Sequence, residues 1–231
     1  MEFPPFLISL QQLYMRPVLR LSTILLLLGT AATALGYFML LRPIKSNQPV
    51  AAEAGPAPMV KIHKARNEKL EAISSGIKAF SIAKGYNPRI AFLVDMSIPS
   101  GRNRFFVYNM QKDSIEMAGL VTHGYGARKT GIEFSNIPGS YCSSLGKYKV
   151  GKSYEGRFGL AFKLHGLDKT NDKAFERFVV LHAHDCVPMQ EIEPLNICES
   201  QGCPTVAPGF LQKLKKYIET SEQPILLNIS Q

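Results

Sequence analysis

Hydrophobic residues are concentrated in one uninterrupted run near the start of the chain. Residues 21–41 read LSTILLLLGTAATALGYFMLL and contain no charged side chain. As a helix rising about 1.5 Å per residue, this run would cross the ~30 Å hydrocarbon core of a bilayer. We therefore predict a transmembrane anchor over 21–41, preceded by a cytoplasmic segment over 1–20. A cleaved signal sequence is the alternative, because Ala32, Ala34 and Gly36 are small, although no clean A-x-A cleavage motif is present.

The rest of the chain divides into a linker and one domain. Residues 42–60 are rich in Pro and Ala, show no apolar periodicity, and predict a semi-extended linker. Residues 61–231 have the length of a single domain, so two separate catalytic domains are excluded.

Two helices are predicted within this domain. Leu70, Ile73, Ile77 and Phe80 recur at helical spacing, and Gly85 is a suitable C-terminal stop. A second amphipathic helix is predicted over residues 208–219, where apolar side chains gather on one side.

Most of the remaining apolar residues follow a strand pattern. Short apolar runs bounded by turn-forming clusters predict strands at 90–96, 104–110, 115–121, 147–150, 158–164, 178–184 and 224–229. In one of them, Phe158, Leu160, Phe162 and Leu164 alternate with small or polar residues. The predicted fold class is therefore mostly β (α+β), with helices at the periphery.

Composition and charge narrow the choice of partners. Hydrophobic residues make up 45% of the chain and charged residues 19%, which excludes wholesale disorder. Residues 61–231 hold 23 Lys and Arg and 16 Asp and Glu, a net charge of +7 that favours polyanionic partners. The basic residues are dispersed and no nucleic-acid-binding motif is present, so we predict no nucleic-acid partner.

Candidate chemistry is concentrated between residues 179 and 205. A thiol becomes a good nucleophile when a neighbouring imidazole accepts its proton, and His182 and Cys203 can meet across a short loop. Gly202 allows a tight turn, and the amides around Cys203 could point at a developing oxyanion.

A zinc site is the metal-binding alternative in this stretch. His182 and His184 would face the same side of a strand and could bind zinc together with Cys186 or Cys198. Their spacing matches no regular zinc motif, so we predict no metal.

These residues also carry a family resemblance. His182, seventeen further residues and the sequence Ser-x-Gly-Cys resemble the signature of the L,D-transpeptidase (YkuD-like) catalytic domain. Further matches, in the order of the murein L,D-transpeptidase branch of Gram-negative bacteria, extend over about residues 68–228: Asp95–Ser100, Arg104, His123–Gly124, Ser143–Gly146, Tyr154, Gly159, Leu164–Leu167, Asn171, Val180–His182 and Gly202–Pro204. Three positions depart from the pattern, namely Ala183 in place of Gly, Gln201 in place of His or Trp, and Glu199 in place of Arg.

The resemblance implies a fold, a substrate and a mechanism. The fold would be an L,D-transpeptidase-like β-sandwich facing the periplasm, tethered to the inner membrane, that acts on peptidoglycan stem peptides without metal or organic cofactor. Cys203 would attack the carbonyl of the third stem residue and release terminal D-alanine, with His182 as base and the Ala183 carbonyl orienting the ring. Amides near Gly202 and Cys203 would hold the oxyanion. An amine of a second stem would then form a 3–3 cross-link, or water would complete a carboxypeptidase reaction.

Some assignments stay open at this level. Ser200, His184 and Tyr154 are possible substrate-binding residues, although each also has a structural interpretation: a turn hydrogen bond, a wall of the site, or a core or rim aromatic. Hydrolysis of a wall–lipoprotein link would use the same Cys and His. A non-catalytic, membrane-tethered wall-binding protein is the alternative of a different class, and it would need neither residue.

The remaining cysteines predict a disulfide. Thiols outside the cytoplasm tend to pair, and Cys186 and Cys198 flank one loop between the predicted histidine strand and the cysteine turn. We predict that they form a bridge and that Cys142 and Cys203 remain free. Closing a loop of about 13 residues would stabilise the fold by ~3 kcal/mol in the chain-entropy model.

Overall fold

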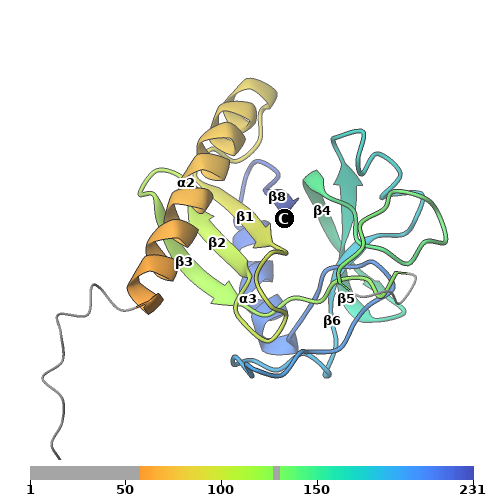
Figure 1. The fold of residues 1–231 in the computed structure, drawn as a ribbon. Coiled ribbons are helices and arrows are strands. Elements are labelled where there is room, and N and C mark those ends of the chain that lie inside the picture. Colours follow the sequence, from red (N-terminus) through yellow and green to blue (C-terminus); the bar gives the residue numbers. More distant parts are fainter. Residues whose placement is uncertain (1–57, 127–130) are drawn as a thin grey trace, which may run out of the picture. The chain divides into compact units, whose positions relative to one another are not determined.

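The computed structural model describes residues 58–126 and 131–231 (Figure 1). These residues form a mixed sheet and two helices, in the chain order α2 (Pro58–Lys84), β1 (Ile90–Asp95), β2 (Phe105–Asn109), β3 (Ser114–Gly119), β4 (Gly146–Gly156), β5 (Gly159–Gly166), β6 (Val180–Ala183), β7 (Thr205–Val206), α3 (Pro208–Glu219) and β8 (Leu226–Ser230). The predicted segments 1–20 and 21–41, and the linker as far as residue 57, lie outside the described residues. No helix in the described part of the chain is long and apolar enough to span a bilayer.

The strands form one sheet of eight, in the order β3-β2-β1-β8-β4-β5-β6-β7. The β1–β8 and β6–β7 pairs are parallel, and the other neighbouring pairs are antiparallel. An isolated bridge between Val121 and Val206 connects the segment after β3 with β7 at the opposite edge. The sheet therefore bends until its edges meet, and the two layers expected of a sandwich are parts of one hydrogen-bonded sheet.

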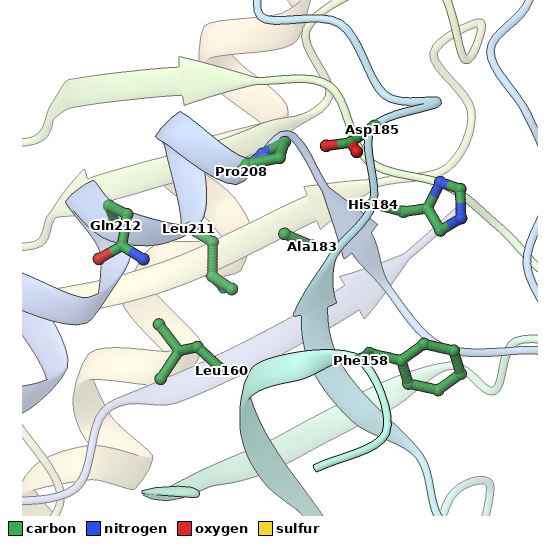
Figure 2. Close-up of a pocket in the computed structure, with 8 residues that line it drawn as sticks. All are labelled: Phe158, Leu160, Ala183, His184, Asp185, Pro208, Leu211 and Gln212. Atoms are coloured by element: carbon green, nitrogen blue, oxygen red, sulfur yellow. The ribbon is translucent and has the colours of Figure 1, made fainter. Parts of the chain in front are cut away.

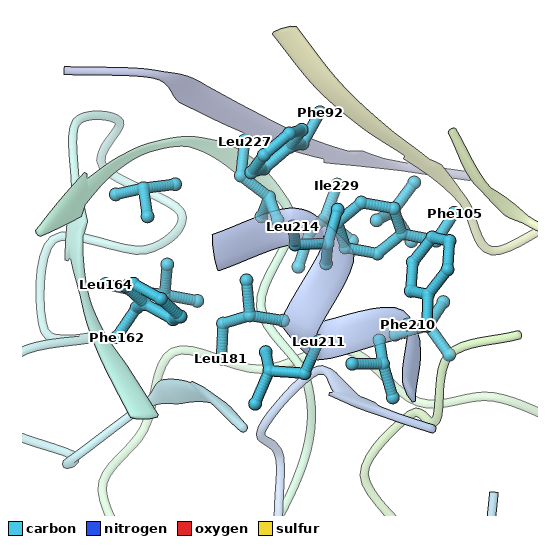
Figure 3. Close-up of a cluster of buried hydrophobic side chains, with 14 of the residues drawn as sticks. Phe92, Phe105, Phe162, Leu164, Leu181, Phe210, Leu211, Leu214, Leu227 and Ile229 are labelled. Atoms are coloured by element: carbon cyan, nitrogen blue, oxygen red, sulfur yellow. The ribbon is translucent and has the colours of Figure 1, made fainter. Parts of the chain in front are cut away.

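The main core lies between this bent sheet and α3 (Figure 3). Phe105 of β2, Phe162 of β5 and Leu181 of β6 pack with Phe210 and Leu214 of α3, and all five side chains are buried. Burying a side chain of this size contributes about 1.5–3 kcal/mol. The segment Pro208–Glu219 is helical because Pro208 is compatible with the first turn and its apolar residues share one face.

A second, smaller core covers the other face of the central strands. Leu70 and Ile77 of α2 pack with Leu93 of β1 and Phe106 of β2. Successive residues of a strand point to opposite faces, so β1 is buried at every position because it contributes to both cores.

Most predicted elements are present, with altered ends. The second predicted helix matches α3, whereas α2 begins at Pro58, inside the predicted linker. The run at 147–150 is part of a longer strand, and the two-residue strand β7 was not predicted. Phe158 does not join the buried row of Phe162 and Leu164, because it lies in the β4–β5 turn and is half-exposed.

Candidate active site

His182 lies on β6, between two strands that hold it on the outer face of the sheet. Its Cα pairs with Ala161 of β5 on one side and Thr205 of β7 on the other. Leu181 points into the main core, so the strand alternation turns Val180 and His182 to the opposite face.

Both nitrogens of the His182 ring have polar partners. Nδ1 is 3.0 Å from the carbonyl oxygen of Ala183, and Nε2 is 3.0 Å from the hydroxyl oxygen of Thr205. The ring of Phe158 stacks on the imidazole, with centroids 4.4 Å apart. Burial lowers the pKa of His182 below its ordinary value, although the Ala183 carbonyl opposes this effect. The ring is therefore neutral at pH 7 and able to accept a proton.

Cys203 lies two residues before β7 and is half-buried. Its Sγ accepts a hydrogen bond from the backbone N–H of Val180 at 3.5 Å and lies 3.8 Å from the carbonyl oxygen of Phe178. Burial raises the pKa of the Cys203 thiol, while the Val180 N–H and the Arg177 guanidinium act in the opposite direction. The thiol is therefore protonated at neutral pH and needs a base to become a nucleophile.

The parallel register explains how the thiol and the imidazole are related. His182 is opposite Thr205, so Cys203, two residues before Thr205, lies next to Val180, two residues before His182. Residues two apart on a strand share a face. The structure brings Cys203 and His182 to the same face of neighbouring segments, as the sequence suggested. However, the described residues include no hydrogen bond between them, and proton transfer requires a side-chain rotation.

The turn before Cys203 is held by small polar side chains. Gly202 has a φ of +107°, and a Cβ there would lie 2.6 Å from the carbonyl oxygen of Cys142, so a larger residue does not fit. The Gly202 N–H donates to the Ser200 hydroxyl at 3.1 Å. Within the described residues, the Cys203 N–H has no hydrogen-bond acceptor. Of the two amides considered for the oxyanion, only that of Cys203 is therefore available here.

A cavity of about 320 Å³ lies beside Ala183 (Figure 2). It is lined by Phe158, Leu160, Ala183, His184, Asp185, Pro208, Leu211 and Gln212. His184, one of the predicted substrate-binding residues, accepts a hydrogen bond from the Cys186 N–H at 3.0 Å through Nδ1. This cavity therefore adjoins the His182 strand and has both apolar and polar walls.

Aromatic side chains lie in the turn before β6, which holds Phe175 and Phe178, and on β4, which holds Tyr154. Phe175 and Phe178 are 51% and 84% exposed, which is unusual for phenylalanine and marks a surface suited to contact. The Nζ of Lys163 lies 5.6 Å from the ring centroid of Tyr154 and 5.2 Å from that of Phe175. Tyr154, predicted as a possible substrate-binding residue, thus shares the Lys163 cation with Phe175.

Sequence comparison decides the family. The family model for the L,D-transpeptidase catalytic domain matches residues 64–226, which is most of the chain. The chain belongs to the L,D-transpeptidase catalytic domain family. The resemblance inferred from the sequence motifs is therefore confirmed.

Solved structures of other proteins resemble this domain at low sequence identity. The helical cell shape determining protein Pgp2 (K307A mutant) from Campylobacter jejuni is 13% identical over 62% of this chain and 47% of its own, with a TM-score of 0.43. The Enterococcus faecium L,D-transpeptidase C442S mutant is 11% identical over 62% of this chain and 52% of its own, with a TM-score of 0.39. Mycobacterium tuberculosis L,D-transpeptidase 1 is 10% identical over 61% of each chain, with a TM-score of 0.31. The matched region thus spans about half of the length of the first of these relatives, and no curated protein sequence matches the chain.

The predicted disulfide of this L,D-transpeptidase domain is confirmed. Cys186 and Cys198 are bonded, while Cys142 and Cys203 are free. The bond removes the two thiolates that a zinc site with His182 would need. The disulfide also closes the loop between β6 and the cysteine turn, so it limits how far Cys203 can move from His182.

Arg177 is a residue of the site that the sequence pattern did not indicate. It lies in the turn before β6, and its guanidinium donates to the carbonyl oxygens of Ser135 at 2.8 Å and Cys142 at 2.6 Å. The Cys142 carbonyl is the group against which Gly202 packs. Arg177 therefore links three segments around the nucleophile and contributes a positive charge that acts to lower the pKa of Cys203.

Glu199, one of the departures from the family pattern, has a partner in the structure. Its Oε1 is 3.6 Å from Nε2 of His123, whose Nδ1 is 2.9 Å from the guanidinium of Arg104. Arg104 is fully buried and also donates to the Val121 carbonyl, and desolvation lowers its pKa to about 10. Glu199 therefore extends the polar chain of Arg104 and His123 to the surface.

Proposed function

We propose that this L,D-transpeptidase domain transfers acyl groups of peptidoglycan stem peptides through a thioester on Cys203. The observation that carries the proposal is the placement of a half-buried thiol and a neutral imidazole on one face of β6 and the segment entering β7. A neutral base beside a protonated thiol is the arrangement that general-base activation of a nucleophile needs.

The first half-reaction forms the thioester. After rotation of the Cys203 side chain toward the ring, His182 accepts the thiol proton, and the thiolate attacks the carbonyl carbon of the third stem residue. The Cys203 N–H stabilises the oxyanion. The C–N bond to the terminal D-alanine breaks, and the proton on His182 passes to the leaving amine.

The second half-reaction regenerates the thiol. The amine of another stem peptide attacks the thioester carbonyl, His182 accepts a proton from this amine, and the proton returns to the Cys203 sulfur as the C–S bond breaks. The product is a 3–3 cross-link. Water in place of the amine gives a shortened stem, so the same residues support hydrolysis.

The surroundings of the thiol suit an extended, charged peptide. The exposed aromatic rings of Phe175 and Phe178 offer apolar contact, and Lys163 offers a cation beside Phe175. The net charge of the domain favours an anionic wall polymer. We propose a periplasmic location, with the run at 21–41 as the inner-membrane anchor.

The proposal is tested by incubating the detergent-solubilised full-length protein with tetrapeptide-containing muropeptides and resolving the products by mass. We expect 3–3 cross-linked dimers together with free D-alanine, and neither product with Cys203→Ala. Tripeptides without dimers would assign the hydrolytic reaction to this domain. Turnover that persists in Cys203→Ala would contradict the proposal.

A further inference from the structure

The Ala183 carbonyl and the Thr205 hydroxyl face the two nitrogens of the His182 ring. The Ala183 carbonyl can only accept a hydrogen bond, so the ring nitrogen facing it at 3.0 Å, Nδ1, carries the proton. Nε2 therefore holds the free lone pair in the neutral ring. The group facing Nε2 at 3.0 Å is the hydroxyl of Thr205, whose side chain is buried.

The hydrogen bonds around the Cys203 carbonyl show where the Thr205 hydroxyl proton points. That carbonyl accepts from the Ser200 hydroxyl at 2.6 Å and from the Thr122 hydroxyl at 3.1 Å. Its two lone pairs are thus occupied at shorter range than the 3.5 Å that separates it from the Thr205 hydroxyl. The Thr205 proton is therefore directed to Nε2 of His182.

We infer that Thr205 is a positioning residue, which holds His182 as the Nδ1-protonated tautomer and keeps its basic nitrogen Nε2 in one orientation. The inference rests on the proposed function, because it gives His182 the role of base. Nε2 can take the thiol proton only after this bond opens, because the Thr205 proton occupies its single free lone pair. Once Nε2 is protonated, the direction of the bond is reversed: the hydroxyl proton stays turned away from the ring and Nε2–H donates to the Thr205 oxygen, so the ring keeps its place in both states.

The position of Thr205 in the sheet makes this role possible. It is directly opposite His182 in the parallel pair and two residues after Cys203 on the same segment, so it lies at the corner between base and nucleophile. Phe158 stacks on the face of the same ring. The hydrogen bonds therefore restrain the imidazole within its plane, and the stacking restrains it perpendicular to that plane. The titratable and charged groups around the pair are His184 on β6, Cys203, Arg177, and Lys163, whose Cα pairs with Val180.

The test uses full-length protein and two matched variants. Thr205→Val keeps the shape of the side chain and removes the hydroxyl, and Thr205→Ser keeps the hydroxyl. Ser74→Ala is the control, because it removes another buried hydroxyl, one that lies on α2 and donates to the Glu71 carbonyl. Two readouts need no peptidoglycan: the pH profile of Cys203 alkylation by iodoacetamide, followed by mass spectrometry, and the ¹⁵N resonances of the His182 ring.

In the wild type, we expect an alkylation step that follows deprotonation of His182, below the ordinary histidine pKa of about 6.5. Thr205→Val should lower the rate of Cys203 alkylation above this pH step by about tenfold or more. This loss is a part of the 10²–10⁴-fold acceleration that general-base assistance supplies. In the Thr205→Val variant, the resonance of His182 Nε2 should move to the position of a ring nitrogen without a hydrogen bond. Thr205→Ser and Ser74→Ala should keep the pH of the step and the Nε2 resonance of the wild type.

The inference would be overturned if Thr205→Val kept both the alkylation profile and the Nε2 resonance of the wild type. It would also be overturned if Thr205→Ser behaved like Thr205→Val. If Thr205→Val does not fold, the wild-type spectrum decides, because a proton on Nε2 of the neutral ring would also overturn it. Failure of muropeptide turnover would overturn the proposed function and leave these two readouts unchanged, so the two failures are distinguishable.

Discussion

The imidazole of His182 lies against the phenyl ring of Phe158, with ring centroids 4.4 Å apart and planes inclined by 20°. Phe158 comes from the turn between β4 and β5 and is half-exposed, so it covers the candidate base from the solvent side. Desolvation is the largest cause of the lowered pKa of His182. The Phe158 ring therefore contributes to the lowered pKa of His182, because it keeps water away from the imidazole.

Phe158→Ala should raise the pKa of His182 toward its ordinary value, because water would then solvate the protonated ring. The low-pH limit of Cys203 acylation should move to higher pH with it. An NMR titration of the histidine ring protons measures the pKa directly. Phe175→Ala is the matched control, since Phe175 is equally exposed and stacks on His165, whose pKa is also lowered by burial. The link would be refuted if Phe158→Ala left the His182 titration where it is in the wild type.

Arg177→Gln should raise the pKa of Cys203 further, because it removes the positive charge that opposes desolvation. It should also lower the free energy of unfolding, since hydrogen bonds to a charged group are worth about 1.5–3 kcal/mol each. Arg177→Lys should keep the thiol pKa near the wild-type value but lose stability, because an ammonium group cannot reach both Ser135 and Cys142. Lys173→Gln, an exposed change in the same turn, is the control. Equal thiol pKa values in Arg177→Gln and Lys173→Gln would argue against the role of Arg177.

Gly202→Ala should destabilise the domain more than Gly139→Ala. Both glycines have positive φ, which costs an alanine about 1–2 kcal/mol. Only Gly202 is confined, because its added Cβ would lie 2.6 Å from the Cys142 carbonyl oxygen, whereas Gly139 has open space. Urea denaturation of both variants gives the comparison. Equal losses of stability would show that backbone conformation alone matters at Gly202.

Replacing Cys186 and Cys198 together by Ala should lower the free energy of unfolding by about 3 kcal/mol in the chain-entropy model. Cys203 should still be alkylated, because the disulfide is not part of the chemistry. Thiol counting on the denatured, unreduced wild type should find two free thiols, those of Cys142 and Cys203. Four free thiols would disprove the bridge.

Local patterns predicted those parts of the fold that depend on neighbouring residues. The helix over 208–219 and the end of α2 just before Gly85 follow from amphipathic spacing and a glycine stop. The parallel pairing of β1 with β8 joins segments from opposite ends of the domain, and no local pattern encodes it. For this reason the single bent sheet was not foreseen.

The candidate site shows the same division. Cys203 and His182 were recognised from their chemistry and spacing, and the disulfide from the two cysteines that flank one loop. Thr205 was missed because β7 has only two residues and therefore no periodicity. Arg177 was missed because its partners lie 35 and 42 residues away along the chain.

The central claim is that Cys203 forms a covalent acyl-enzyme with the help of His182. The most direct measurement is the mass of the full-length protein after exposure to a carbapenem, followed by peptide mapping of the adduct. A carbapenem is a strained acyl donor, so one drug mass is expected on the peptide that contains Cys203 and none in Cys203→Ala. His182→Ala should slow the reaction by about 10²–10⁴-fold. An adduct on Cys142, or an adduct that survives in Cys203→Ala, would contradict the account.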